Sequence, residues 1–208
     1  MKYFETLPKV ITTDYRNNAL LLTNIMARAE IIPALLSNPL IFYSYDIQEG
    51  DSPEIIAHKY YGDSYRYWLV LFANQILDPQ FEWPLTSQQF DLYLNDKYSA
   101  AANSSTVLSY TQSTIQEYRK SITTYDPVSL ETTTKTIVID QSTYNTTQTG
   151  TVTQSFSDGT SVTQTTTKTA VSIYDYEIEK NEEKRNIKLI NSDYASDFEK
   201  QFTSLMGS

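Results

Sequence analysis

The sequence of 208 residues contains no cysteine and a single histidine, His58. Without cysteine the chain forms no disulfide and offers no thiolate for metal binding or nucleophilic catalysis. No phosphate-binding loop, dinucleotide fingerprint, nucleophile elbow or metal motif accompanies the lone histidine. We therefore expect no catalytic, cofactor or metal site, and we expect that the protein is not an enzyme.

Basic residues are scarce, because 16 Lys and Arg stand against 25 Asp and Glu and the formal net charge is −9. Phosphate binding needs clustered Lys and Arg, so we expect no nucleic-acid partner. The basic residues form no run and no helix face, so we expect no membrane attachment. No apolar run approaches the ~20 residues that span a bilayer, and MKYFETLPKV at 1–10 lacks the apolar core of a signal peptide.

Tyrosine, in contrast, is abundant at 17 residues. Its large apolar ring and polar tip favour protein interfaces, although the same side chain fills cores and covers strand faces. Composition alone leaves both interpretations open.

The best organised region begins at 43–47, YSYDI, which alternates as a strand does. The residues EGD at 49–51 predict a sharp turn. Ser52 is a good N-cap and Pro53 suits the first helical position. Gly62 can take the left-handed conformation that ends a helix. A strand, a turn and a helix are therefore expected in this order.

A second helix is expected over 65–74, YRYWLVLFAN, with apolar residues on both faces. The i, i+3, i+4, i+7 spacing puts these side chains on one face: Tyr65, Trp68, Leu69 and Phe72. The opposite face carries three others: Tyr67, Val70 and Leu71. A helix of this kind must be covered on both sides. We expect contacts outside the module to bury the second face, supplied either by the N-terminal segment or by a partner protein.

The flanking regions are less regular. Residues 17–29 have apolar positions at helical spacing, and SNP at 37–39 predicts a turn. Thr dominates 132–169, where strand-like alternation and Asp158-Gly159 predict a β-hairpin. A Thr-rich stretch can also be a glycosylated stalk, but the alternation favours strands. A further helix is expected near TSQQ at 86–89, and a closing one at 197–206.

Spaced residues in 45–74 resemble a LysM domain. They are Tyr45-Asp-Ile47-Gln-Glu-Gly50-Asp51-Ser52, Ile55-Ile56-Ala57, Tyr61-Gly62, Trp68 and Ala73-Asn74. The resemblance implies a βααβ fold whose groove holds N-acetylglucosamine chains in glycan-binding members. Four motif positions are expected mainly to maintain the fold: Gly50, Asp51, Trp68 and Asn74. Gly50 would allow the turn, and Asp51 would tie its backbone.

The sequence departs from that pattern after Asn74, where DPQFEWPL at 78–85 replaces the usual second strand. One wall of the groove is therefore altered, and Trp83 is expected to act as a partner anchor near it. The module also occurs once, so the chain lacks the gain in affinity that tandem copies supply. We do not expect glycan binding, and a LysM-type glycan-binding module is the alternative to the structural function described next.

The whole chain is similar to a narrower family, the LysM-like wedge subunits of contractile-tailed bacteriophage baseplates. The similarity covers about 40–100 and 175–206, and the Thr-rich region has no match in it. The matching residues are YGD at 61–63, Asp78-Pro79, Trp83 and TSQ at 86–88. In the C-terminal segment they are Glu179, Asn181, Glu182, Lys184, Arg185, Ile187 and Lys188.

The resemblance implies a structural protein that joins other wedge proteins and holds neighbouring wedges in a ring around the tail hub. It implies a place in the virion, at the tail baseplate, after assembly in the host cytoplasm.

The sequence therefore predicts an α+β chain with a small LysM-like domain, an N-terminal helical arm, a Thr-rich β-hairpin region and a C-terminal helix. The partner interface is expected at Tyr67, Val70, Leu71 and Trp83. The expected divisions are a 1–42 arm, a 43–98 LysM-like domain with the following helix, a 99–130 connector, a 131–176 Thr-rich ribbon and a 177–208 charged segment and helix.

Overall fold

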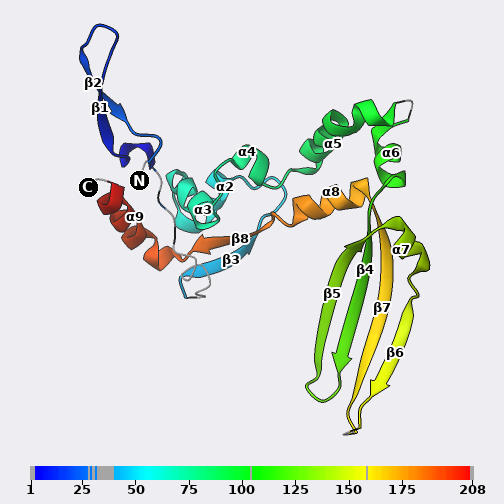
Figure 1. The fold of residues 1–208 in the computed structure, drawn as a ribbon. Coiled ribbons are helices and arrows are strands. Elements are labelled where there is room, and N and C mark those ends of the chain that lie inside the picture. Colours follow the sequence, from blue (N-terminus) through cyan, green and yellow to red (C-terminus); the bar gives the residue numbers. More distant parts are fainter. Residues whose placement is uncertain are drawn as a thin grey trace. The chain divides into compact units, whose positions relative to one another are not determined.

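The computed structural model describes residues 3–27, 29, 31, 40–103, 105–157 and 159–206. Helices and small antiparallel sheets occur together, which confirms the α+β class (Figure 1). The chain divides into two compact units. Unit 1 is formed by Met1–Ser87 and Asn181–Ser208, and unit 2 by Gln88–Lys180.

Unit 1 is built around a strand, two helices and a second strand. Their bounds are β3 Phe42–Asp46, α2 Pro53–Tyr61, α3 Tyr67–Ala73 and β8 Asn186–Ile190, with the short 3-10 helix η2 Ser64–Arg66 before α3. Strand β8 pairs antiparallel with β3 from Phe42↔Ile190 to Asp46↔Asn186. The order agrees with the βααβ arrangement that the LysM resemblance implies, although the second strand comes from much later in the chain. The relation to LysM modules itself stays a prediction.

The local signals around α2 act as expected. The Ser52 hydroxyl accepts a hydrogen bond from the Ile55 N–H at 3.3 Å, and Pro53 occupies the first turn. Gly62 ends the helix with φ +73, a value that strains other residues. A short helix, α4 Pro79–Glu82, follows α3 and begins after Asp78, whose side chain accepts from the Gln80 N–H.

The C-terminal helix α9, Ser192–Met206, begins earlier than the 197–206 segment predicted and packs on α3. The rings of Trp68 and Phe202 lie 4.8 Å apart. Arg66 makes a bidentate ion pair with Glu199 at 3.0 and 3.1 Å. Helix α9 therefore covers the first apolar face of α3.

The N-terminal region contains a β-hairpin, and the helix predicted over 17–29 is wrong for its central part. After the short 3-10 helix η1 Tyr3–Glu5, β1 Lys9–Thr13 pairs antiparallel with β2 Ala19–Thr23. The Asp14 carboxylate accepts from the N–H groups of Arg16 and Asn18, and Asn17 has φ +66. This turn chemistry overrides the helical spacing of the apolar residues.

Unit 2 contains a four-stranded antiparallel sheet in the order β5-β4-β7-β6. The bounds are β4 Ile115–Asp126, β5 Glu131–Ile139, β6 Gly150–Ser155 and β7 Ser161–Ser172. The predicted hairpin is present as β6 and β7, with Gly159 at φ +85 in the turn. Strand β4 pairs with β7 of the Thr-rich ribbon. It lies in the 99–130 stretch that was predicted to be a connector.

Unit 2 also contains helices. They are α5 Ser87–Ala102, α6 Val107–Ser113, α7 Gln141–Thr146 and α8 Ile173–Glu182. Helix α5 begins within the predicted TSQQ signal. Helices α5 and α8 cross the predicted divisions at 98/99 and 176/177, so those divisions do not coincide with element boundaries. The turn predicted at 37–39 lies outside the described residues, and so do Arg28 of the 17–29 segment and Asp158 of the predicted hairpin turn.

A buried carboxylate links α8 to α5 inside unit 2. Glu177 is 6% exposed, and its carboxylate accepts from Lys97 Nζ at 2.7 Å, Tyr98 OH at 2.6 Å and Tyr93 OH at 3.0 Å. Burial raises the pKa of Glu177, but these hydrogen bonds outweigh it and hold the pKa below its usual value. The rings of Phe90 and Tyr174 also meet, at 6.0 Å.

Candidate protein-interaction surfaces

The turn after β3 is closed by Asp51. Its carboxylate accepts from the Gln48 N–H at 3.1 Å, from Tyr45 OH at 2.7 Å and from Lys59 Nζ at 2.6 Å. Gly50 has φ +83, which few other residues adopt without strain. Burial raises the pKa of Asp51, but the hydrogen bonds, that of Lys59 first, lower it below its usual value. Asp51 thus ties the backbone of the turn in unit 1.

The other two motif residues also serve the fold. Asn74 joins the end of α3 to β8, since its Nδ2 donates to the Lys188 carbonyl at 2.8 Å and its Oδ1 accepts from the Lys188 N–H at 2.7 Å. Its Nδ2 also lies 2.8 Å from the Val70 carbonyl. Trp68 is 3% exposed and packs in the core that contains α9.

The second apolar face of α3 is covered by this chain. Val70 is 0% exposed, in a core with Ile47, Ile56, Ala57, Trp83, Ile187 and Leu189. The covering strand is β8, which lies outside the module and is not the N-terminal segment considered from sequence. Tyr67 and Leu71 pack partly buried against the same core.

Trp83 also belongs to that core, since it is 9% exposed and its indole N–H donates to the Asp51 carbonyl at 2.9 Å. Val70 and Trp83 are therefore packed inside unit 1. A partner contact at the four predicted residues, Tyr67, Val70, Leu71 and Trp83, stays a prediction.

The C-terminal motif docks on the segment that replaces the expected strand. Asn181 exchanges two hydrogen bonds with the backbone of Leu85, at 2.7 and 3.0 Å, and Lys184 Nζ donates to the Phe81 carbonyl at 2.8 Å. The Ile47 N–H donates to the Arg185 carbonyl at 2.9 Å. The docking of the C-terminal motif on residues 81–85 was not predicted from the sequence. The one signal for it was the absence of a second strand after Asn74, because that absence left the module in need of a strand from elsewhere in the chain.

Two large surfaces remain exposed in the described structure. The first is the β1–β2 hairpin, whose strands are exposed along almost their whole length. Its apolar side chains keep large exposed fractions: Val10 47%, Ile11 76%, Leu20 42%, Leu21 66% and Leu22 51%. Opposed pairs share a face, and Val10↔Leu22 and Ile11↔Leu21 are successive pairs. Both faces of the hairpin are therefore apolar.

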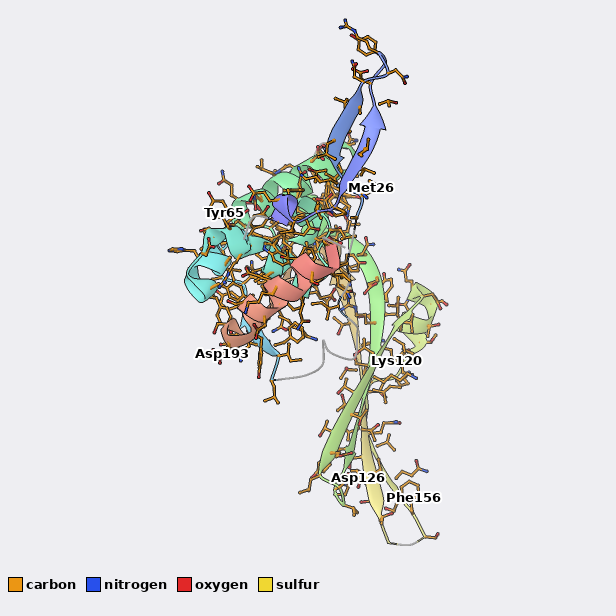
Figure 2. The ribbon with its side chains drawn as sticks, turned by 90° about the vertical axis from the view of Figure 1, so that its left-hand side faces the viewer. Met26, Tyr65, Lys120, Asp126, Phe156 and Asp193 are labelled. Atoms are coloured by element: carbon orange, nitrogen blue, oxygen red, sulfur yellow. The ribbon has the colours of Figure 1, made fainter. Side chains whose placement is uncertain are left out.

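The second surface is the sheet of unit 2. Figure 2 shows Asp126 and Phe156 together at one end of the sheet, with side chains standing out from both faces. Helix α7 lies over one face near the other end, where the Tyr118 and Tyr144 rings meet at 4.7 Å and Lys168 Nζ donates to the Tyr144 carbonyl at 2.8 Å. Every residue of β6 is exposed, and so is β5 up to its last residue.

The opposite face of the sheet is a hydroxyl face. The register places these residues on it, in rows across the strands: Ser121, Thr136 and Thr167; Thr123, Thr134, Thr165 and Thr151; Tyr125, Thr132, Thr163 and Thr153. Neighbouring hydroxyls pair at 2.9 Å for Ser121 with Thr136 and 3.0 Å for Thr151 with Thr165. The face offers hydrogen-bonding groups but little apolar area.

The described residues contain no group of three or more His, Cys, Asp or Glu side chains able to hold a metal ion. In the same part of the chain, no helix has both the length and the apolar character to cross a bilayer.

The search of curated proteins finds no match to this chain. A family model described as base plate wedge protein 53, from phages, matches residues 31–205. The match includes unit 2 and most of unit 1, and it leaves the β1–β2 hairpin of unit 1 outside. The chain therefore belongs to the phage base plate wedge protein 53 family, and it is a structural protein of the virion's tail baseplate that interacts with other baseplate proteins.

Proposed function

We propose that this chain joins other wedge proteins and holds neighbouring wedges in a ring, by burying its exposed surfaces against them. We further propose that it catalyses no reaction, binds no nucleic acid and attaches to no membrane. The observation that carries the proposal is the β1–β2 hairpin, an apolar surface exposed on both faces in a chain of the base plate wedge family.

The hairpin requires a partner for physical reasons. An isolated two-stranded hairpin is marginally stable in water, and contiguous exposed apolar surface of this kind marks an interaction site. Ile11 and Leu21 form one apolar face and Val10, Leu20 and Leu22 the other. A wedge protein with an apolar groove that contacts both faces would remove this surface from water, and stable interfaces bury about 1,600 Å² in total.

The proposed contact is tested by Leu21→Asp in the full chain, co-expressed with the other baseplate proteins. Leu21 is 66% exposed, so the free chain should keep its melting temperature, while the yield of the purified wedge complex should fall at least tenfold. The matched control is Leu92→Asp on α5, because Leu92 is 64% exposed. It should leave the complex yield unchanged.

Two results would reject the proposal. The first is an unchanged complex yield with Leu21→Asp. The second is a wild-type chain that stays monomeric with every baseplate protein and is absent from purified virions.

A further inference from the structure

The sheet of unit 2 ends in two open edges. Strand β5 pairs with β4 and strand β6 pairs with β7, and neither has a second strand beside it in the described structure. Both strands are exposed along almost their whole length. An open edge presents unpaired backbone N–H and C=O groups, which are a template for another strand.

Strand β6 lacks the features that normally protect an edge. Its sequence, GTVTQS at 150–155, contains no charge and no proline. The Phe156 N–H donates to the Thr160 carbonyl at 2.8 Å. In an antiparallel ladder hydrogen-bonded pairs alternate with open ones, so the backbone groups of Thr151, Thr153 and Ser155 point to the open edge. Three successive outward positions are thus available to a partner strand.

The chain directions of the edge strands β5 and β6 allow them to pair between two copies. Each neighbouring pair in the order β5-β4-β7-β6 is antiparallel, so β5 and β6 run in opposite directions. We propose that β5 of a second copy of this chain adds antiparallel to β6, so that the two sheets become one continuous sheet. The occupant of the β6 edge is therefore a second copy of the chain.

The side chains of the two edges are compatible. On the hydroxyl face, β6 presents Thr151 and Thr153, and β5 presents Thr132, Thr134 and Thr136. The Thr–Thr contacts across the new boundary would repeat those inside the sheet, such as Thr123 with Thr134 at 3.1 Å. Because β6 carries no charge, no like-charged pair can arise opposite the Lys135 of β5.

A contact between different edges has a consequence for the assembly. Two copies joined in this way still present one free β5 at one end and one free β6 at the other, so the contact propagates and closes only as a ring. This inference rests on the proposed function, since it names the surface through which neighbouring wedges would meet. The hairpin would then serve contacts with other wedge proteins, and the sheet edges contacts between copies of this chain.

Cysteine cross-linking tests the pairing directly, because the chain contains no cysteine of its own. Thr153→Cys on β6 is combined in turn with Thr132→Cys, Thr134→Cys or Thr136→Cys on β5, so that the possible registers are covered. Within one copy these strands are three spacings apart, ~14 Å, too far for a disulfide. Across the proposed boundary opposed Cα atoms lie ~5.5 Å apart.

Virions and full-length chain carrying each pair are oxidised and analysed on non-reducing gels. At least one pair should give a ladder of dimers, trimers and larger species that a reductant removes. Each single-cysteine variant should stop at dimers in much lower yield. The control pair Ser121→Cys with Thr136→Cys, whose native hydroxyls are 2.9 Å apart, should form a disulfide within one chain and give no ladder.

Two outcomes overturn the inference. One is the absence of a ladder from all three pairs in virions where the control pair oxidises. The other is dimers from a single-cysteine variant in the yield of the paired variants, since these would show that like edges meet. If the variant chain is present in the virions, either result leaves the wedge-joining function standing. That function fails instead if the wild-type chain purifies with no wedge protein.

Discussion

In unit 1, helix α3 is covered on both faces by its own chain, whereas in unit 2 strands β5 and β6 are exposed along almost their whole length. Unit 1 also uses its motif side chains internally, as Asp51 does in the turn and Asn74 does at β8. In the sheet of unit 2 the hydroxyls pair with one another across the strands. The edge strands β5 and β6 each have a neighbouring strand on one side alone in the described structure.

This difference in burial indicates which residues stabilise the fold and which are available for assembly. Buried apolar area is the main favourable contribution to folding, and in unit 1 it is concentrated in two small cores. The sheet and the β1–β2 hairpin instead keep surface that a partner can remove from water. Substitutions in the cores of unit 1 should therefore change folding, and substitutions at the hairpin and the sheet edges should change assembly.

The largest effect is expected for Leu189→Ala in β8. Leu189 is 0% exposed, and losing its buried methyl groups should lower the free energy of unfolding by about 2–5 kcal/mol. The matched substitution Val152→Ala in β6, where Val152 is 68% exposed, should change it by less than about 0.5 kcal/mol.

Urea unfolding followed by tryptophan fluorescence measures the first change, since the chain has 2 Trp, Trp68 and Trp83, both in unit 1. Circular dichroism covers the Val152 variant. Similar losses for the two variants would contradict the comparison.

Much of unit 1 could be predicted from the sequence because its signals are local. Ser52, Pro53 and Gly62 determine the start and end of α2 by their own backbone chemistry. The long-range partner of β3 could not be predicted, because β8 lies more than a hundred residues away and its pattern, NIKLI, is too short to specify a partner. Without β8 in view, the second apolar face of α3, which carries Val70, indicated a need for cover by the N-terminal segment or by a partner protein.

The flanking regions show two other limits. Helical spacing in 17–29 favoured a helix, but the Asp14 turn and the φ +66 of Asn17 direct a hairpin. In unit 2 the Thr-rich alternation correctly predicted strands, but β4 was missed because its polar residues resemble a connector. The exposed hairpin and the sheet edges therefore did not appear among the predicted site residues.

The next effect in size is expected for Glu177→Gln in unit 2. The amide leaves the Lys97 ammonium without its anionic partner and weakens the bonds from Tyr93 and Tyr98. Because hydrogen bonds to charged groups contribute about 1.5–3 kcal/mol each, the free energy of unfolding of unit 2 should fall by about 2 kcal/mol. Thermal unfolding by circular dichroism measures this.

The control for Glu177→Gln is Glu131→Gln at the exposed start of β5. It should leave the melting temperature unchanged. Equal destabilisation by both variants would show that loss of net negative charge, and not the Glu177 network, is responsible.

A smaller effect is expected from acid. The folded-state pKa of Asp51 is held below its usual value, chiefly by Lys59 against the opposing effect of burial. Its stabilising contribution is therefore complete above the unfolded-state pKa of about 3.9, and it is lost as the pH falls through the folded-state pKa. Asp51→Asn should lower the free energy of unfolding at pH 7 by about 1–2 kcal/mol. The free energy of unfolding of the variant should also fall less steeply as the pH is lowered. Tryptophan fluorescence at a series of pH values measures both, and an unchanged acid-side slope in the variant would contradict the assignment.

The smallest effect is expected on glycan supports, where the full chain should be retained no better than an unrelated acidic protein. In unit 1 the Asp51 carboxylate is already occupied by Lys59 and Tyr45, and Trp83 is packed in the core of the module. The chain is passed over chitin and peptidoglycan and competed with chitooligosaccharide. Gly50→Ala, which strains the turn at φ +83, serves as the matched variant. Retention of the wild type that the oligosaccharide removes, and that Gly50→Ala reduces, would show that the module binds glycans as well as maintaining unit 1.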